Sequence, residues 1–534
     1  MRLARYHGGM PSIEHVDRDR YDAVLFDTDG VITDTASAHA AAWKLLFDAW
    51  LEEHAARAGE EYRPFDANAE YRQYVDGKPR YDGVRSFLES RGIALPFGAP
   101  DDTPDQETVC GLGNRKDAHF NEWLENNRVR VFPGTLEFIR KLRGAGILVA
   151  AFSASRNMKK VLDNAGIAEL FDAQVDGCLM AELGLPGKPD PAILQTAADL
   201  LDVPIGRCII VEDAIAGVDA AHSGGAAVAI GIDRAGSGVT LIEHGADLVV
   251  DDLSECRVDA SGHIQRKRVG DLESAWQRKD ELHALLRERR AAVLLDYDGT
   301  LTPIVTDYRK AFLSGAMRDT LDTLSQRCTV GVISGRDLAD VRQLVGLDTV
   351  FYSGSHGFEL SGPNEWHHVQ EHARAFLPDL DRSEAALREA LADIEGHAVE
   401  RKRFSIAAHY RQVPGDRVPE VEAVIDRVLA NSPALQKGLG KKVFELKPAI
   451  AWDKGRAVEL LLDRLGMHAD DSLAVYVGDD VTDEAVFRVL RHPNLSIVLD
   501  EGNRLTSADH TLADCDDVKR FLDWLAESAT GTGR

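Results

Sequence analysis

The sequence predicts an α/β protein built from two related parallel-sheet cores. Runs of four to six aliphatic residues, bounded by polar turns, are typical of buried parallel strands, and amphipathic stretches lie between them. One acidic stretch occurs twice, as AVLFDTDGVITDT from position 23 and as AVLLDYDGTLTP from position 292. The copies lie about half a chain apart, so either one active site was duplicated or the acidic loop has a structural use.

The apolar runs form two series that divide the chain into halves. The first series is AVLF at 23, ILVAAF at 147 and CIIV at 208, and the second is AVLL at 292, VGVI at 330 and AVYV at 474. Amphipathic stretches such as PGTLEFIRKLRGAG and GAMRDTLDTLSQRC are expected to be the helices that pack on these sheets. We therefore predict one domain over 18–255, a second over 291–534, and a charged linker or bridging helix over 256–290.

The two halves are expected to carry unlike caps. In the first half, mostly helical residues from about 40 to 125 separate the first strand from the second. In the second half, the long insertion runs from about 362 to 438 and contains strand-like alternation, as in HAVERKRFSIAAHYRQV. The sequence thus predicts a helical cap on the first core and an α+β cap on the second.

Composition restricts the class of partner. The 534 residues carry a formal net charge of −26, which argues against a nucleic-acid groove or an anionic membrane surface as the main partner. A small phosphorylated ligand remains compatible with this charge, because a metal ion and a few Lys or Arg can reverse the sign inside one pocket. We therefore expect small-molecule substrates, with no nucleic acid and no membrane.

Cysteine usage and the first residues point to the cytoplasm. The six cysteines include no Cys-x-x-Cys pair, and Cys208 and Cys328 lie in or beside apolar runs, as reduced core thiols do. The opening stretch MRLARYHGGMPSIEH has no apolar core of a signal peptide, and no run approaches the ~18 apolar residues of a membrane helix.

The acidic stretch suits phosphoryl transfer. Residues i and i+2 of a strand project to one side, so Asp-x-Asp at a strand tip aims two carboxylates, or a carboxylate and a neighbouring carbonyl, at one point. The first carboxylate can attack phosphorus to form an aspartyl-phosphate, and the second can protonate the leaving oxygen and later activate water. Attack by an anion on a phosphate dianion needs a cation between them, for which Mg²⁺ is the natural choice.

Both halves provide the remaining groups in the same order along the chain. Each group alone is weak evidence, because a lone Asp-x-Asp is usually a cap and a lone Ser or Lys is usually an ordinary surface residue. The ordered set at strand ends, found twice, is a strong signal. The first set is Asp27, Asp29, Ser153, Lys188, Glu212 and Asp213, and the second is Asp296, Asp298, Ser334, Lys454, Asp479 and Asp480.

These motifs resemble those of the haloacid-dehalogenase-like phosphotransferases over nearly the whole chain. The resemblance implies two Rossmann-like cores, Mg²⁺ as cofactor, and an aspartyl-phosphate on Asp27 or Asp296. In the first half it implies a catalytic set of Asp27, Asp29, Ser153 and Lys188, with Mg²⁺ among Asp27, Asp29, Glu212 and Asp213.

The second half resembles trehalose-6-phosphate phosphatase in six stretches, among them VISGRDLADV, YSGSHGFEL, GKKVFELKPAIAWDKG and VGDDVTDEAVF. The resemblance implies hydrolysis of trehalose 6-phosphate in trehalose biosynthesis. Asp296 would be the nucleophile and Asp298 the acid and base, while Ser334 and Lys454 would hold the phosphoryl group. Mg²⁺ would lie among Asp296, Asp298 and Asp479, with Asp483 nearby. The implied substrate-binding residues are Arg336, His356, Glu400, Lys402, His409, Arg411 and Glu445.

Bland alternatives remain for this half. Without the family, Glu400 and Lys402 would be interpreted as an exposed cross-strand ion pair. A broad sugar-phosphate phosphatase is the competing enzyme, and a carbohydrate-binding or scaffolding protein is the competing non-enzyme.

The first half resembles β-phosphoglucomutase in FDTDGVITDTASAHAAAWK, GNRKDAHF, FSASRN and ELGLPGKPDP. His39, Arg115 and Lys116 fall where that family handles phosphate, and the lid arginine would be Arg80 or Arg85. Three roles stay open for this half: a mutase-like phosphotransferase, a phosphatase, or a non-catalytic partner domain.

Overall fold

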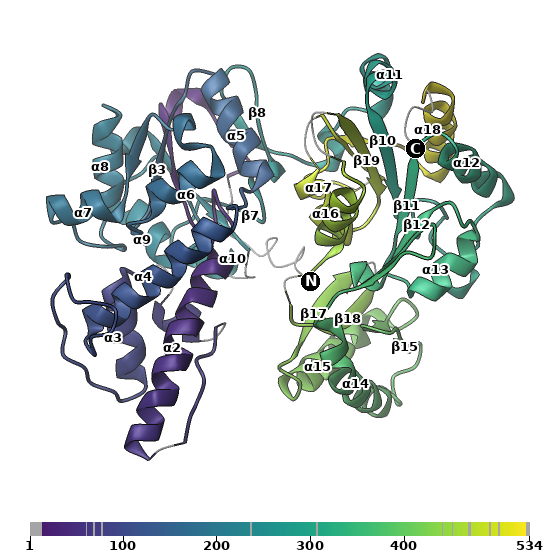
Figure 1. Ribbon diagram of the computed structural model, residues 1–534. Helices are drawn as coiled ribbons and strands as arrows, with labels where there is room; N and C mark the ends of the chain where they lie inside the picture. The colour runs from purple at the N-terminus through teal and green to yellow at the C-terminus, as the bar shows by residue number, and fades with distance from the viewer. Residues whose placement is uncertain are drawn as a thin grey trace. The chain divides into compact units, whose positions relative to one another are not determined.

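The computed structural model describes residues 13–529 except for 60, 68–69, 76–77, 235–237, 306–307, 441, 451, 468–470, 491–492 and 500–501. The predictions made for residues 1–12 and 530–534 lie outside this range. The chain divides into two compact units, and the boundary along the sequence lies between Arg266 and Lys267 (Figure 1). In the described part of the chain, every helix is too short or too polar to cross a membrane.

The first unit contains a six-stranded parallel sheet in the order β4-β3-β2-β5-β6-β7. Aliphatic side chains on both faces form two buried clusters under the flanking helices, which explains the continuous apolar runs. The strands are β2 (Ala23–Asp27), β3 (Leu148–Phe152), β4 (Ala173–Val175), β5 (Cys208–Glu212), β6 (Val228–Ile232) and β7 (Leu248–Val250), and the helices are α5 (Pro133–Gly144), α6 (Met158–Ala165), α7 (Gly177–Leu183), α8 (Ala192–Leu200), α9 (Ile215–Gly224) and α10 (Gly238–Glu243).

The cap of the first unit is helical, as predicted. It is formed by α2 (Ala36–Ala58), α3 (Arg80–Ser90) and α4 (Val109–Asn126), which extend from one end of the core in Figure 1. Its own aromatic core includes Trp43, Phe47 and Phe87, so the cap has a hydrophobic core separate from those of the sheet.

The stretch 256–290, predicted as a linker or bridging helix, is divided between the two units. Its first part forms β8 (Cys256–Val258) and β9 (Ile264–Arg266), which pair with β1 (His15–Val16) in a three-stranded antiparallel sheet of the first unit. Its last part forms α11 (Lys279–Glu288), which packs into the second unit. Buried apolar residues such as Ile264 and Leu282 hold the two parts to different cores, because exposing them would cost hydrophobic free energy.

The second unit contains an eight-stranded sheet in the order β14-β13-β12-β11-β10-β19-β20-β21. The central strands are parallel, whereas β13 and β14 add an antiparallel edge that the sequence did not predict. Helices α12 and α18 cover one face, while α16 and α17 cover the other. The elements are β10 (Arg290–Leu295), α12 (Gly315–Ser325), β11 (Thr329–Ile333), α13 (Leu338–Val345), β12 (Phe351–Gly354), β13 (Glu359–Ser361), β14 (His367–Val369), α16 (Lys454–Arg464), β19 (Ser472–Gly478), α17 (Glu484–Val489), β20 (Leu495–Val498), β21 (His510–Thr511) and α18 (Cys515–Ser528).

The cap of the second unit is an α+β layer. A four-stranded antiparallel sheet, β15-β16-β18-β17, packs against α14 (Leu377–Ala390) and α15 (Val418–Ala430). Its strands are β15 (Ala398–Arg401), β16 (Ile406–His409), β17 (Leu435–Gly440) and β18 (Val443–Pro448). The cap therefore continues past the predicted end near 438, because β17 needs β18 as its hairpin partner.

Candidate active sites

The acidic set of the second unit gathers at the carboxyl ends of β10, β11 and β19. Asp296 follows β10 and Asp479 follows β19, and these neighbouring parallel strands end at the same edge of the sheet. Lys454, the first residue of α16, donates from its Nζ to Asp296 Oδ1 at 2.6 Å. Asp296 is 5% exposed and Lys454 is 3% exposed, so the ion pair is held away from bulk water.

Three carboxylates crowd this strand end. Oxygens of Asp296, Asp479 and Asp483 lie within 4.8 Å of one another. Burial, with Asp483 and Asp479 nearby, raises the pKa of Asp296 well above its ordinary value, although Lys454 opposes the shift. Burial acts to lower the pKa of Lys454, but Asp296 and Asp483 raise it above its ordinary value. The cluster therefore carries excess negative charge and would be stabilised by a cation.

Asp483 anchors the side chain of Lys454. Its Oδ1 accepts from Lys454 at 2.8 Å and from the hydroxyl of Tyr476 at 2.6 Å. Its Oδ2 accepts from the backbone amides of Asp479 and Asp480, at 3.0 and 2.9 Å. These four hydrogen bonds fill the acceptor sites of a carboxylate, so Asp483 is better suited to orienting Lys454 than to binding a metal directly.

The first unit has a matching arrangement around Asp27. Lys188 Nζ donates to Asp27 Oδ1 at 2.8 Å and to Glu212 Oε1, and the three carboxylates of Asp27, Glu212 and Asp213 lie within 4.8 Å of one another. The other oxygen of Glu212 accepts from the amides of Asp213 and Ala214, both at 3.2 Å. Glu212 thus makes the contacts in this unit that Asp483 makes in the second.

The acidic pairs Glu212-Asp213 and Asp479-Asp480 are offset from each other by one position in the two sheets. In the sheets, Val211 lies opposite Phe26 and Val477 lies opposite Leu295, so Glu212 takes the position of Gly478 and Asp213 that of Asp479. A Cβ at Gly30 would overlap Asp213, and a Cβ at Gly299 would overlap Asp479, which supports the same equivalence.

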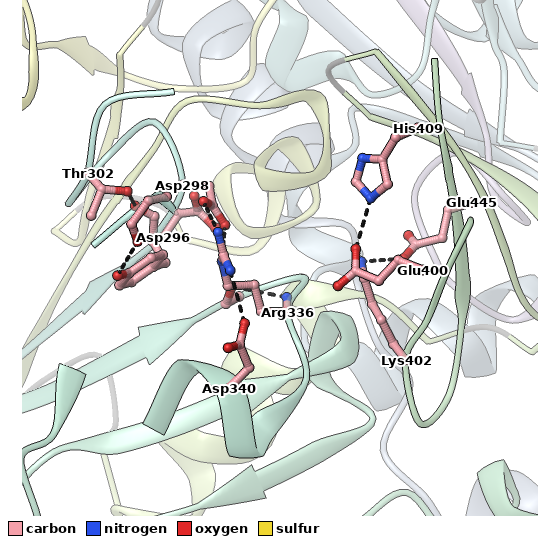
Figure 2. Close-up of polar contacts among 12 residues, drawn as sticks. Asp296, Asp298, Thr302, Arg336, Asp340, Glu400, Lys402, His409 and Glu445 are labelled. Atoms are coloured by element: carbon pink, nitrogen blue, oxygen red, sulfur yellow. Dashed lines mark hydrogen bonds and ion pairs between the residues drawn. The ribbon is translucent and has the colours of Figure 1, made fainter. Parts of the chain in front are cut away.

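Asp298 lies apart from the carboxylate cluster to which the resemblance assigned it. Its two oxygens accept from Arg336, from Nε at 2.7 Å and from Nη2 at 2.8 Å. Figure 2 shows the guanidinium between Asp298 and Asp340. Any contribution of Asp298 to a metal site would therefore come from its backbone carbonyl, the option that the strand-tip geometry leaves open.

In the second unit, a cavity of about 480 Å³ lies between the acidic residues around Asp296 and the cap. Polar side chains of the cap line its far side, and they are paired with one another (Figure 2). Glu400 pairs with His409 at 2.8 Å, and Glu445 accepts from Lys402 at 3.0 Å. Glu445 also pairs with the core residue His356 at 2.7 Å. The remaining cap residue of the predicted set, Arg411, donates to the carbonyl of Val305 at 2.9 Å.

The cap cluster is charged and ranges from half-buried at Glu400, Lys402 and His409 to buried at Glu445, so it is not an exposed ion pair. Burial acts to lower the pKa of Lys402, but Glu445 and Glu400 raise it above its ordinary value. Glu445 is 6% exposed and faces the cavity that also contains Ser334 and Lys454. A cluster of this kind can exchange its internal hydrogen bonds for those of a polyhydroxylated ligand.

Several residues that line the cavity were not among the predicted site residues, although some of them lie inside the stretches quoted above. Gln412 and Val443 come from the cap, while Ile304, Arg309 and Thr482 come from loops of the core. They reach the cavity only because the cap folds over the strand ends, and no local pattern in the sequence encodes that approach.

In the first unit, Asp29 is held by residues of the cap helices. His39 Nε2 lies 3.5 Å from Asp29 Oδ1, and Lys116 Nζ lies 2.7 Å from His39 Nδ1. The Ser153 hydroxyl donates to Asp29 at 3.3 Å, and Thr35 also donates to it. Burial raises the pKa of Asp29, but His39, Thr35 and Lys116 together hold it well below its ordinary value.

The structure separates the candidate lid arginines. Arg80 is half-buried at the start of α3 and pairs with Asp117 at 2.9 Å, and Asp117 also accepts from the core residue Asn157 at 2.6 Å. Arg85 pairs with Asp82 on the exposed face of the same helix. Arg115 donates to the carbonyl of Pro104, inside the cap. Arg80 is therefore the arginine placed at the junction of cap and core.

Comparison with known proteins agrees with this architecture. A haloacid dehalogenase-like hydrolase model matches residues 21–225, and a trehalose-phosphatase model matches residues 294–516. The trehalose-phosphate phosphatase of Mycobacterium leprae is 38% identical over 419 residues, which cover 75% of this chain and 94% of that protein. A glycosyl hydrolase of Mycobacterium tuberculosis, named as uncharacterised, is 40% identical over 517 residues, or 96% of this chain. The chain spans only 38% of the length of that relative.

Among solved structures, the β-phosphoglucomutase of Clostridium difficile matches with 26% identity and a TM-score of 0.36, over 44% of this chain and 92% of that one. Two parallel-sheet cores with acidic strand ends and caps define a protein of the haloacid-dehalogenase-like class. More narrowly, the chain belongs to the trehalose-phosphatase family.

Proposed function

We propose that the second unit hydrolyses trehalose 6-phosphate to trehalose and phosphate. The observation that carries the proposal is the single cavity in which the catalytic set around Asp296 faces the cap residues Glu400, Lys402 and Glu445. The core side matches a phosphoryl group, and the cap side offers charged acceptors and donors for sugar hydroxyls, because a site that pairs with hydroxyls rejects ligands that lack them.

The proposed reaction has two steps. In the first, a carboxylate oxygen of Asp296 bonds to phosphorus, the bond from phosphorus to the sugar oxygen breaks, and Asp298 gives that oxygen a proton. In the second, Asp298 takes a proton from water, the water oxygen bonds to phosphorus, and the bond to Asp296 breaks. Lys454 and Ser334 bind the phosphoryl oxygens throughout.

Asp296 and Asp479 fit a Mg²⁺ site, because buried carboxylate oxygens are the ligands that this ion prefers and the cluster carries excess negative charge. When bound, Mg²⁺ would reduce the repulsion between Asp296 and the phosphate dianion. In the first unit, Asp27 and Asp213 are the corresponding pair.

The function is tested by comparing kcat/KM for trehalose 6-phosphate and glucose 6-phosphate. We expect a preference for trehalose 6-phosphate of at least about 10-fold, since one lost charged hydrogen bond costs ~1.5–3 kcal/mol. Equal values would favour a broad sugar-phosphate phosphatase. Sugar binding that survives EDTA without any phosphate release would favour a binding protein.

Removal of divalent metal is expected to stop turnover. After dialysis against EDTA, phosphate release from trehalose 6-phosphate should fall to background, and added Mg²⁺ should restore it. Differential scanning calorimetry should show an upward shift of the second unit's melting temperature on adding Mg²⁺, because a ligand of the native state stabilises it. Full activity in EDTA would contradict the metal assignment.

Glu400→Gln is expected to weaken sugar recognition selectively. The variant should raise KM for trehalose 6-phosphate by about 10- to 100-fold, the loss of one charged hydrogen bond, while hydrolysis of p-nitrophenyl phosphate changes little. Glu420→Gln is the matched control, because Glu420 pairs with Arg417 on an exposed part of the same cap. An equal loss on both substrates would assign Glu400 a structural role.

We propose in addition that the first unit is a mutase-like phosphotransferase. The supporting observation is the chain from Asp29 through His39 to Lys116, because α2 and α4 of the cap supply the residues that hold the second carboxylate. Cap closure would then assemble the acid and base only when a sugar phosphate is bound, which favours transfer to a sugar over transfer to water.

The activity of the first unit should fall as pH rises. Burial lowers the pKa of Lys116 to about 8, and its protonated amine is the donor that orients His39. With Asp296→Asn silencing the second unit, conversion of β-glucose 1-phosphate in the presence of glucose 1,6-bisphosphate should decline through a pKa near 8. Lys116→Gln, which keeps a donor but does not titrate, should be less active and lack this decline. A decline that persists in Lys116→Gln would assign it to another group.

A further inference from the structure

Arg336 makes contacts that phosphate binding does not require. It lies two residues after Ser334 in the loop between β11 and α13, and its side chain is only 7% exposed. Two nitrogens of its guanidinium group, Nε and Nη2, both donate to the carboxylate of Asp298. Paired N–H···O bonds of this kind fix the plane of the carboxylate as well as its position.

Two further contacts fix Arg336 itself. Its Nη1 donates to Asp340 Oδ2 at 2.9 Å, from the first turn of α13. Its guanidinium carbon lies 5.3 Å from the centre of the Tyr297 ring, within range of a cation–π contact. The order Asp340, Arg336, Asp298 therefore runs from a helix of the core to the rim of the cavity (Figure 2).

The first unit holds its second carboxylate by other means. The residue two positions after Ser153 is Ser155, whose side chain has no guanidinium group. Asp29 is instead contacted by Thr35, His39 and Ser153. Each core thus supplies partners for this carboxylate from different places in the chain. In the first unit they include cap helices, whereas in the second they belong to the core.

We propose that Arg336 is a positioning residue that aims the carboxylate of Asp298 at the reacting phosphorus, and that Asp340 holds Arg336 in place. The proposal rests on the hydrolysis proposed above. Each carboxylate oxygen has two acceptor positions, so the fork leaves room for the proton of the attacking water. Because the holding residues belong to the core, Asp298 stays aligned for the second step while the cap opens to release the sugar.

The test uses the full chain and p-nitrophenyl phosphate, whose leaving group departs without a proton, with the activity of Asp296→Asn subtracted. In Arg336→Gln and Arg336→Lys, we expect kcat to fall about 10²- to 10³-fold, the scale of general-base catalysis. KM should fall together with kcat, because slowing the second step alone leaves kcat/KM almost unchanged, whereas the Ki of inorganic phosphate should stay within about twofold. Rapid mixing should show a burst of p-nitrophenolate and accumulation of acid-trapped phosphoenzyme, because only the second step is slowed.

Asp340→Asn should lower kcat by a smaller factor, and it should add nothing in the Arg336→Gln background. Arg342→Gln is the matched control, since Arg342 pairs with Asp348 near the other end of α13. A rise of more than tenfold in the Ki of phosphate with kcat preserved would show that Arg336 binds phosphate and would overturn the proposal. So would loss of kcat without any phosphoenzyme. Failure of the wild type to turn over trehalose 6-phosphate, with the burst intact, would sink the substrate assignment alone.

Discussion

Asp296→Asn should abolish phosphate release from trehalose 6-phosphate, with kcat reduced on the order of 10⁴-fold or more. An amide of the same shape cannot attack phosphorus, and it gives Lys454 a neutral partner in place of an anion. The buried position allows water no ready way to substitute for the lost nucleophile. The measurement is steady-state phosphate release by the full chain at saturating Mg²⁺.

Asp27→Asn is the matched control, because it makes the same chemical change beside Lys188 in the first unit. It should leave hydrolysis of trehalose 6-phosphate within about twofold of the wild type, since the second unit has a complete set of its own. If Asp27→Asn alone removed the activity, the functions of the two halves would have been assigned in reverse. Mass spectrometry of the acid-quenched wild type should locate phosphate on the peptide that contains Asp296.

The sequence was informative where chemistry follows directly from a strand. Asp296, Ser334 and Asp479 each follow an aliphatic run, and neighbouring parallel strands necessarily bring their ends together. Lys454 could be predicted for the same reason, because it begins the helix beside those strands. The two parallel cores and their unlike caps followed from the same periodicity.

The rest depended on contacts between segments far apart in the chain. The sequence did not indicate that Arg336 would donate hydrogen bonds to Asp298, which lies 38 residues earlier, because either side chain could equally have faced solvent. The hairpin of β8 and β9 is short and charged, and only its pairing with β1, about 250 residues earlier, reveals it as sheet. The Asp483 contacts to Lys454 and Tyr476 are likewise invisible in the motif VGDDVTDE.

The acidic residue that holds the lysine and a nearby glycine occupy opposite positions in the two units. The first unit has Glu212 at the strand end and Gly217 five residues later, whereas the second has Gly478 at the strand end and Asp483 five residues later. A Cβ at Gly217 would overlap the carboxylate of Glu212, and a Cβ at Gly478 would overlap that of Asp483. The carboxylate that holds the lysine therefore comes from the strand end in the first unit and from a residue five positions later in the second. In each unit the other position must be glycine, because a Cβ there would overlap that carboxylate.

This exchange predicts a rescue. Asp483→Gly should lower the free energy of unfolding of the second unit by about 3–5 kcal/mol, because it leaves the Lys454 ammonium buried without one of its two partners. It should also lower kcat for trehalose 6-phosphate about 10²- to 10³-fold, the scale seen when one preorganised donor is displaced. Gly478→Glu alone should be comparably harmful, because its side chain would collide with Asp483.

The combination of Gly478→Glu with Asp483→Gly should recover most of both losses, since Glu at 478 would copy the contacts of Glu212 to Lys188 and to the following amides. Each of these variants is also made together with Tyr476→Phe. The hydroxyl of Tyr476 donates to Asp483, whereas the residue at the same position in the first unit is the apolar Ile210. Thermal unfolding and kcat are measured for each single change and for the pair. Losses that simply add in the pair would mean that the two carboxylates do not share one site.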